Sequence, residues 1–221
     1  MRRGLIVVAG LALAACSPSP RTSAPPSNAA PASAAAAASS AASVGATASS
    51  AAVSADPAGW TRYASAGFSI ATPPGWTIDT AYDDQELGPG QDIHGVSFTI
   101  PASLAKGTNL SSNSYISVET LPGLKTCATS AFLSDADPKP AVTQNGVTFQ
   151  VAEANQGAAG NVYDETVYVA QGASPCIAVR YFIHSTNIGN YDPGTIKAFD
   201  QAALVARFDA IRKTLRLTPA G

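Results

Sequence analysis

Residues 174–186 read SPCIAVRYFIHST, and they contain a nearly continuous apolar run from Cys176 to Ile183. A strand that is covered on both faces reads as such a run, whereas a strand with one solvated face alternates apolar and polar residues. We therefore expect this stretch to be a central strand of a sheet. A turn over 171–175 joins it to another strand, which is expected over 162–172.

The runs upstream show the alternation that is typical of half-buried strands. The run YISVETL (115–121) places its aliphatic residues on one face, and Tyr115, Ser117 and Glu119 on the other. The pair Asn145-Gly146 stands between two β-rich runs within 141–156 and is a strong signal for a hairpin. Further strands are expected within 63–76, from 76 onward, and over 95–101.

Two segments have helical character. The segment LKTCATSAFL (124–133) fits a short helix. From Ile196 the apolar residues recur with helical periodicity over about 20 residues. Asp192 or Thr195 can cap the start of this helix, and it must end before Pro219.

Together these elements predict one α+β domain over 58–221, a length that suits a single hydrophobic core. Its antiparallel sheet has about six or seven strands, covered by a long C-terminal helix and a shorter helix. The formal net charge of the chain is −2. Because no basic cluster is present in the sequence, we expect no nucleic-acid partner.

The stretch GFSIATPPGW (67–76), followed by later hairpins and a closing amphipathic helix, resembles the PsbP-like domains. That fold also occurs in a nuclear Ran-binding protein and in actinobacterial lipoproteins, and the likeness covers roughly 61–217. The resemblance implies a binding or assembly role, because these domains mostly lack catalytic machinery. It assigns no ligand residues and no cofactor to this chain.

The N-terminus has the organisation of a secretory signal. Met1-Arg2-Arg3 is positively charged, and the apolar stretch 4–13 is too short to span a bilayer. The segment Leu13-Ala14-Ala15-Cys16 resembles the lipobox of bacterial lipoproteins. The resemblance implies that 1–15 is removed and that Cys16 carries lipid on its sulfur and its amine, which anchors the protein stably in a membrane. The alternative is an ordinary cleaved signal with an incidental cysteine.

Residues 16–57 are almost wholly Ala, Ser, Pro, Thr and Gly after the cysteine. Such a segment cannot bury enough apolar surface to offset the entropy of ordering, so we expect a disordered tether. Ser17 resembles the residue that directs lipoproteins of Gram-negative envelopes to the outer membrane. The expected location is therefore the periplasmic side of the outer membrane.

With Cys16 lipidated, Cys127 and Cys176 remain. An even pair of cysteines in an oxidising compartment most simply forms a disulfide. The alternative is a pair of free buried thiols.

Candidate catalytic residues are few, because the sequence holds two histidines, His94 and His184. A Ser185, His94 and Asp92 set would suit a hydrolase, but no G-x-S-x-G motif supports it. The histidines lack the spacing of known zinc motifs. We expect no catalytic site, no cofactor and no metal, and an envelope enzyme that uses His94 or His184 is the alternative.

Two groups of side chains are candidates for binding. The acidic segment 79–92 offers oxygens that could hold an ion, although a run of charge is more often a solvated face. Trp60, Tyr63 and Trp76, together with Tyr191 in a polar loop, are the candidate ligand or partner surface. For Trp60, Tyr63 and Trp76, packing at a sheet edge is the favoured alternative.

The predicted function is that of a membrane-anchored envelope lipoprotein with a non-catalytic binding or assembly domain. Its partner is an unknown envelope protein or small ligand. A structural lipoprotein that contacts the cell wall is a further alternative.

Overall fold

The computed structural model describes residues 55–85, 87–88 and 90–218. The expected signal peptide, Cys16 and nearly all of the expected tether therefore lie outside the described residues. Glu86, in the acidic segment, also lies outside them.

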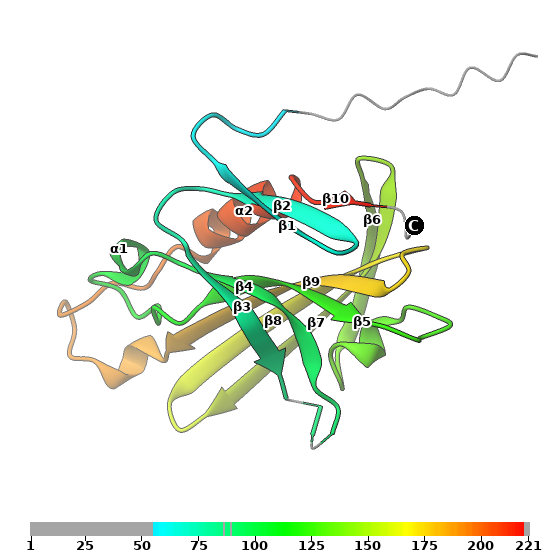
Figure 1. Cartoon of the computed structure of the whole chain (residues 1–221). Helices are drawn as coiled ribbons and strands as arrows, with labels where there is room; N and C mark the ends of the chain where they lie inside the picture. The colour runs from blue at the N-terminus through cyan, green and yellow to red at the C-terminus, as the bar shows by residue number, and fades with distance from the viewer. Residues whose placement is uncertain (1–54, 86, 89, 219–221) are drawn as a thin grey trace, which may run out of the picture. The chain divides into compact units, whose positions relative to one another are not determined.

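Within the described residues, the main sheet has seven antiparallel strands (Figure 1). In spatial order they are β3 (Thr77–Asp84), β4 (Ile93–Thr99), β5 (Tyr115–Leu121), β9 (Cys176–Thr186), β8 (Asn161–Ala170), β7 (Val147–Ala158) and β6 (Asp137–Gln144). The apolar run from Cys176 to Ile183 lies in β9, the fourth of the seven strands. A central strand is paired and packed on both sides, which accounts for its composition.

Two-residue turns join the three strands at one edge of this sheet. Asn145 and Gly146 connect β6 to β7 with φ angles of 50° and 78°. Ala159 and Gly160 connect β7 to β8 with φ angles of 50° and 83°. Positive φ at both central residues is the property of the turns whose twist matches a hairpin.

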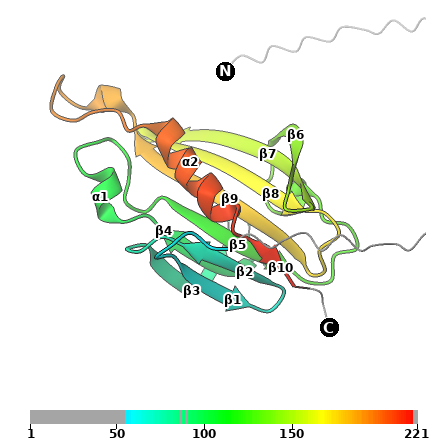
Figure 2. The same ribbon diagram turned by 90° about the horizontal axis from the view of Figure 1, so that it is seen from above.

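A second, three-stranded sheet and one helix cover the same side of the main sheet (Figures 1 and 2). The small sheet consists of β1 (Thr61–Ser65), β2 (Phe68–Thr72) and β10 (Arg216–Leu217), and the helix is α2 (Gln201–Arg212). The core between these layers includes Ile70, Phe98, Val179 and Phe208, all fully buried. Arg212 ties α2 to the main sheet, because its Nε donates a hydrogen bond of 2.7 Å to Tyr181 Oη.

The prediction of a long C-terminal helix is wrong. The α2 helix has 12 residues, and its N-cap is Asp200, whose side chain accepts a hydrogen bond from Ala203 N, rather than Asp192 or Thr195. Residues before it are held by the segment 107–110, since Lys197 N donates to Gly107 O and Asn109 N donates to Lys197 O. Residues after it leave the helix to pair with β2 as β10.

The prediction of a shorter helix over 124–133 is also wrong. The structure has one 3₁₀ turn there, η1 (Thr129–Ala131), in a segment tied to the sheet through Cys127. The adjacent Phe132 and Leu133 are both buried, whereas Leu124 is exposed. The other short elements are α1 (Ala102–Ala105) and η2 (Ile188–Asn190).

The fold class is therefore mostly β, and the α+β assignment with two covering helices is corrected. The sequence at both ends of the expected C-terminal helix has helical periodicity. In the structure, the backbone there forms hydrogen bonds with other segments of the chain instead of continuing the helix. Propensity is a weak prior that tertiary context routinely overrides.

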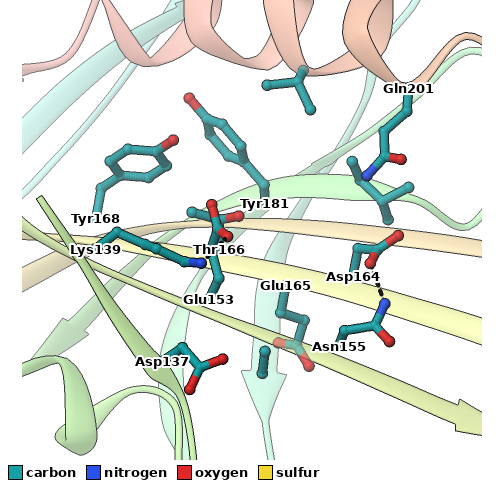
Figure 3. Close-up of a pocket in the computed structure, with 13 residues that line it drawn as sticks. Asp137, Lys139, Glu153, Asn155, Asp164, Glu165, Thr166, Tyr168, Tyr181 and Gln201 are labelled. Atoms are coloured by element: carbon teal, nitrogen blue, oxygen red, sulfur yellow. Dashed lines mark hydrogen bonds and ion pairs between the residues drawn. The ribbon is translucent and has the colours of Figure 1, made fainter.

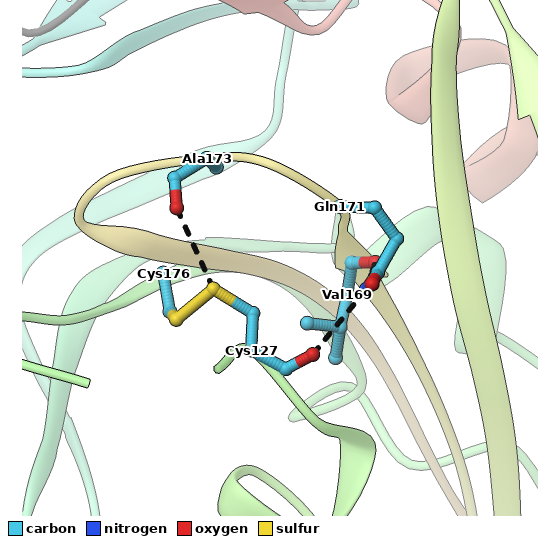
Figure 4. Close-up of a disulfide and its surroundings, with 5 residues drawn as sticks. All are labelled: Cys127, Val169, Gln171, Ala173 and Cys176. Atoms are coloured by element: carbon cyan, nitrogen blue, oxygen red, sulfur yellow. Dashed lines mark hydrogen bonds between the residues drawn. A yellow bond between two sulfur atoms is a disulfide. The ribbon is translucent and has the colours of Figure 1, made fainter. Parts of the chain in front are cut away.

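The η1 segment covers part of the opposite side of the main sheet. A second buried cluster lies there and includes Ile93, Phe132, Val167 and Ala178. Cys127 and Cys176 form a disulfide with a Cα–Cα distance of 5.4 Å (Figure 4). Gln171 Nε2 donates a hydrogen bond of 3.3 Å to Cys127 O beside it. The η1 segment is thus fastened covalently to the central strand.

Candidate ligand-binding face

Five aromatic side chains form a continuous row on the side of the main sheet that faces away from α2. We call this set the ring row; its members are Tyr82, Tyr115, Phe182, Tyr163 and His184. Successive ring centroids are 5.4, 4.8, 6.0 and 4.6 Å apart in that order. The Tyr115–Phe182 and Tyr163–His184 pairs are stacked.

Strand register places these rings side by side. Tyr115 on β5 is the direct partner of Phe182 on β9, and His184 on β9 is the direct partner of Tyr163 on β8. Alternate residues of β9 point to opposite faces, so Phe182 and His184 share a face while Ile183 points into the core under α2. All five rings are partly exposed.

Tyr82 joins the row across Gly95. The register aligns Tyr82 with Gly95, and Gly95 with Glu119. A Cβ atom on Gly95 would lie 2.4 Å from Val118 O, so only glycine fits this close approach of β4 to β5. With no side chain at Gly95, Tyr82 Oη reaches Glu119 Oε1 at 3.0 Å and Tyr115 Oη at 3.1 Å.

A buried ion cluster lies next to the row. Arg180, two residues before Phe182 on the same face, contacts the carboxylates of Asp84, Glu119 and Glu165. The side chains of all four residues are at most 4% exposed. Arg180 Nη2 also donates to Phe132 O in the η1 segment. The cluster joins β3, β5, β8, β9 and the η1 segment.

The cluster determines what this face offers to a ligand. Every nitrogen of the Arg180 guanidinium has a protein acceptor, so Arg180 is occupied rather than available to an anion. Burial by itself would lower the pKa of Arg180, but Glu119 and Asp84 hold that pKa above its ordinary value. Burial raises the pKa of Tyr82 and of Tyr115, so both hydroxyls stay protonated.

A hollow of about 270 Å³ adjoins the row. Its lining includes Phe132, Ser134, Gln156 and Arg180. Gln156 is the direct strand partner of Tyr163, so the hollow and the row meet at this pair. The face therefore combines a row of stacked aromatic rings with a polar depression at its side.

His184 is fixed at the end of the row by two amides. Its Nδ1 lies 2.9 Å from Asn113 Oδ1, and its Nε2 lies 3.0 Å from Asn161 Oδ1. Burial lowers the pKa of His184, so the neutral imidazole is favoured. A neutral imidazole carries one N–H, so it donates to one of these two amide oxygens and not to both.

A separate hollow of about 280 Å³ lies on the α2 side (Figure 3). It is bordered by exposed charges, among them the Lys139–Glu153 ion pair at 3.1 Å. Asn155 donates a hydrogen bond to Asp164 in the same lining. Glu153 and Asp164 thus have partners on this rim, whereas Glu165, which also lines the hollow, is buried in the Arg180 cluster.

His94 belongs to a third hollow, of about 300 Å³, which Tyr63 also lines. Its ring contacts Asp83 rather than Asp92, through a hydrogen bond and ion pair that are largely exposed. That hydrogen bond, with the charge of Asp83, raises the pKa of His94. His94 and His184 lie on opposite faces of the sheet, so the structure does not bring the two histidines into one site.

The other candidate residues are dispersed. Tyr63 packs edge-on against Phe98 at 5.9 Å, and Trp76 packs edge-on against Phe208 at 5.8 Å. Trp60 also packs against that core, whereas Tyr191 is 39% exposed at the end of η2. Packing on the α2 side is thus what the structure shows for Trp60, Tyr63 and Trp76.

The acidic segment 79–92 is divided among several roles. Asp84 is buried in the Arg180 cluster, Asp83 contacts His94, and Asp79 accepts a hydrogen bond from Ala81 N. Among the described residues, no group of three or more metal-ligating side chains could hold a metal ion.

Most of the ring row was not singled out from the sequence. The alternation at 115–121 puts Tyr115 on the face opposite the aliphatic residues, and this pattern is the sequence signal that could have indicated a member of the ring row. The row became visible only through register, because its members come from β3, β5, β8 and β9.

Comparison with known proteins adds little to this picture. No protein-family model and no curated protein matches the chain. Among solved structures, a crystal structure of a protein from Bacteroides thetaiotaomicron matches with a TM-score of 0.39 and 13% identity. The match covers 72% of this chain and 48% of the other, so this chain spans about half the length of that protein. A similarity this weak carries no argument about fold family or function.

In the part of the chain that the structure describes, no helix has the length and apolar character needed to cross a membrane.

Proposed function

We propose that this chain is a lipid-anchored, non-catalytic binding protein of the cell envelope, on the periplasmic side of the outer membrane. Its binding surface is the ring row. The resemblance of 13–16 to a lipobox and the Ala/Ser/Pro-rich composition of 16–57 support the anchor and the tether.

The observation that carries the binding role is that five rings lie contiguously and partly exposed on one face. Large aromatic surfaces are favourable to bury, and aromatic residues dominate the energetics of binding sites. In the domain's core, comparable rings such as Phe98, Phe149 and Phe208 are fully or almost fully covered. A row left in contact with solvent is therefore better explained by a ligand than by folding.

The chemistry around the histidines supports a binding role rather than an enzymatic one. Both ring nitrogens of His184 are occupied by amides, which neither activate a nucleophile nor orient a general base as a carboxylate does. His94 is oriented by Asp83, but its ring is mostly in solvent, where hydrogen bonds and charges stabilise a transition state only weakly.

Site-specific photocross-linking in cells tests this proposal. The photoreactive residue p-benzoylphenylalanine would replace Tyr163 in the full-length protein, and Tyr191 in a control that carries the same probe on an exposed loop. We expect an envelope component to be captured at Tyr163 and not at Tyr191. Capture at Tyr191 alone, or at neither position, would overturn the ring row as the binding surface.

A further inference from the structure

We infer that a second binding site lies on the α2 side of the domain, and that its ligand is an amphiphile with an acyl chain and an anionic head group. The site is a hollow of about 240 Å³ between α1 and the first half of α2 (Figure 2). The inference goes beyond the proposed function, because no member of the ring row lines this hollow.

The walls of the hollow are apolar. Leu104 of α1, Leu110, Phe199 and Leu204 of α2 line it from four separate parts of the chain. Leu110 and Leu204 are buried, and Leu104 and Phe199 are partly buried against the same core. A hydrocarbon chain placed here would remove apolar surface from water on both partners, which is the main driving force for such binding.

The sequence of α2 forms one wall of the hollow. Asp200, Ala203, Leu204 and Arg207 all line it. They have the spacing i, i+3, i+4 and i+7, so they lie on one face of the helix. The small side chain of Ala203 stands between the two charged residues of this stripe. The helix therefore offers the hollow an apolar centre with a charged group on each side of it.

Two of the three polar side chains in the lining are already engaged. Thr108 Oγ1 donates a hydrogen bond of 2.9 Å to Ala105 O and accepts one of 3.2 Å from Leu110 N. Asp200 Oδ1 accepts a hydrogen bond of 2.9 Å from Ala203 N at the start of α2, where the helix dipole stabilises its negative charge. A peptide in the hollow would bury amide groups that need partners, which this lining does not supply. A hydrocarbon chain needs none.

The third polar side chain is Arg207, and it selects the head group. It is exposed, and within the described part of the chain it forms no side-chain hydrogen bond or ion pair. Two further exposed cations are close by: Lys106 directly follows α1, and Lys197 is the bridge partner of Thr108. Neither lysine forms an ion pair with another described residue. Because a guanidinium binds carboxylate and phosphate groups through paired hydrogen bonds, the head group that fits this rim is anionic.

Photocross-linking with lipid probes tests the inference. The full-length protein would be placed in phosphatidylcholine nanodiscs with one of three probes that carry a diazirine on the acyl chain: a fatty acid, a phosphatidylglycerol or a fatty alcohol. Mass spectrometry of the peptides locates the label. We expect the fatty acid or the phosphatidylglycerol to label 102–110 or 199–207, and the more efficient of the two identifies the source of the ligand. The uncharged alcohol should label these segments about tenfold less, because it cannot form the charged contact.

Two variants separate the head group from the chain. Arg207→Gln removes the cation and should reduce labelling by the anionic probes about tenfold. Ala203→Phe fills the hollow and should abolish labelling by all three probes. Lys125→Gln is the matched control, because Lys125 is exposed, forms no ion pair among the described residues and does not line the hollow. An unchanged thermal transition for each variant shows that lost labelling is not lost folding.

The remaining outcomes overturn the inference. Absence of label from both segments removes the site. Equal labelling by the alcohol and the fatty acid, or by the wild type and Arg207→Gln, removes the anionic head group. Labelling that survives in Ala203→Phe places the acyl chain elsewhere. None of these results depends on capture at Tyr163, so failure of this site and failure of the ring row are distinguishable.

Discussion

Arg180 Nε donates a hydrogen bond of 2.7 Å to Glu119 Oε1, between neighbouring strands, with the two side chains 1% and 0% exposed. This pair is the centre of a cluster in which one guanidinium meets three carboxylates. Ser117 Oγ and Tyr82 Oη also donate to Glu119 Oε1, and they help to stabilise its buried charge. The ring row is therefore supported from beneath by a network that depends on one cation.

Removing that cation should unfold the domain readily. Arg180→Leu removes the positive charge that three buried carboxylates contact, and breaking a buried pair in this way costs about 3–5 kcal/mol. Chemical denaturation measures the loss in the free energy of unfolding. As a control, Lys139→Met removes an exposed ion pair, which contributes about 1 kcal/mol or less. Similar small losses for both variants would contradict the structural role of the cluster.

The disulfide should contribute comparably. It links residues 49 apart in sequence, and loss of such a bond typically costs about 2–5 kcal/mol. We expect Cys127→Ala and Cys176→Ala each to be destabilising, and the double variant to be no worse than either one. Reductant should lower the melting temperature of the wild type and of no variant. Two free thiols per chain at these positions, titrated in unfolded and unreduced protein, would refute the bond.

The two histidines should titrate on opposite sides of 6.5, their ordinary pKa. Asp83 raises the pKa of His94, so the contribution of His94 to stability is fully present below pH 6.5 and is lost as the pH rises through the folded-state pKa. Burial lowers the pKa of His184, so its contribution is present above pH 6.5 and is lost as the pH falls. NMR titration of the imidazole Hε1 signals measures both. Asp83→Asn should lower the pKa of His94 and leave that of His184 in place.

The N-cap of α2 offers a test of where the helix begins. Asp200→Ala removes the acceptor for Ala203 N and should cost about 1 kcal/mol in the free energy of unfolding. Asp192→Ala should change it by about 0.5 kcal/mol or less, because Asp192 lies outside the helix. The reverse order of effects would place the start of the helix before Asp200.

The anchor is tested at Cys16. Cys16→Ser should abolish lipid attachment and leave the signal peptide uncleaved by the lipoprotein peptidase. Mass spectrometry of the mature N-terminus gives the answer directly. Absence of an acyl mass on the wild-type protein would remove the lipoprotein prediction.

Several elements of the fold were accessible from the sequence because their signals are local. Alternation identified β5 over 115–121, Asn145-Gly146 marked the turn between β6 and β7, and the apolar run placed β9 in the middle of the sheet. The C-terminal helix was predicted to be too long. Lys197 pairs with the 107–110 segment and Arg216 pairs with β2, and neither pairing is visible in the local sequence.

By itself, the sequence determined which residues alternate along each strand, where the tight turns lie, and that Cys127 and Cys176 are an even pair. The tertiary structure alone decided which side chains meet. Strands β3, β5, β8 and β9 bring Tyr82, Tyr115, Tyr163 and Phe182 together from segments up to a hundred residues apart. The physical reason is register: a shift of one residue in any pairing would move a strand's side chains to the other face. Only the folded pairing therefore gives a ring row above the Arg180 cluster.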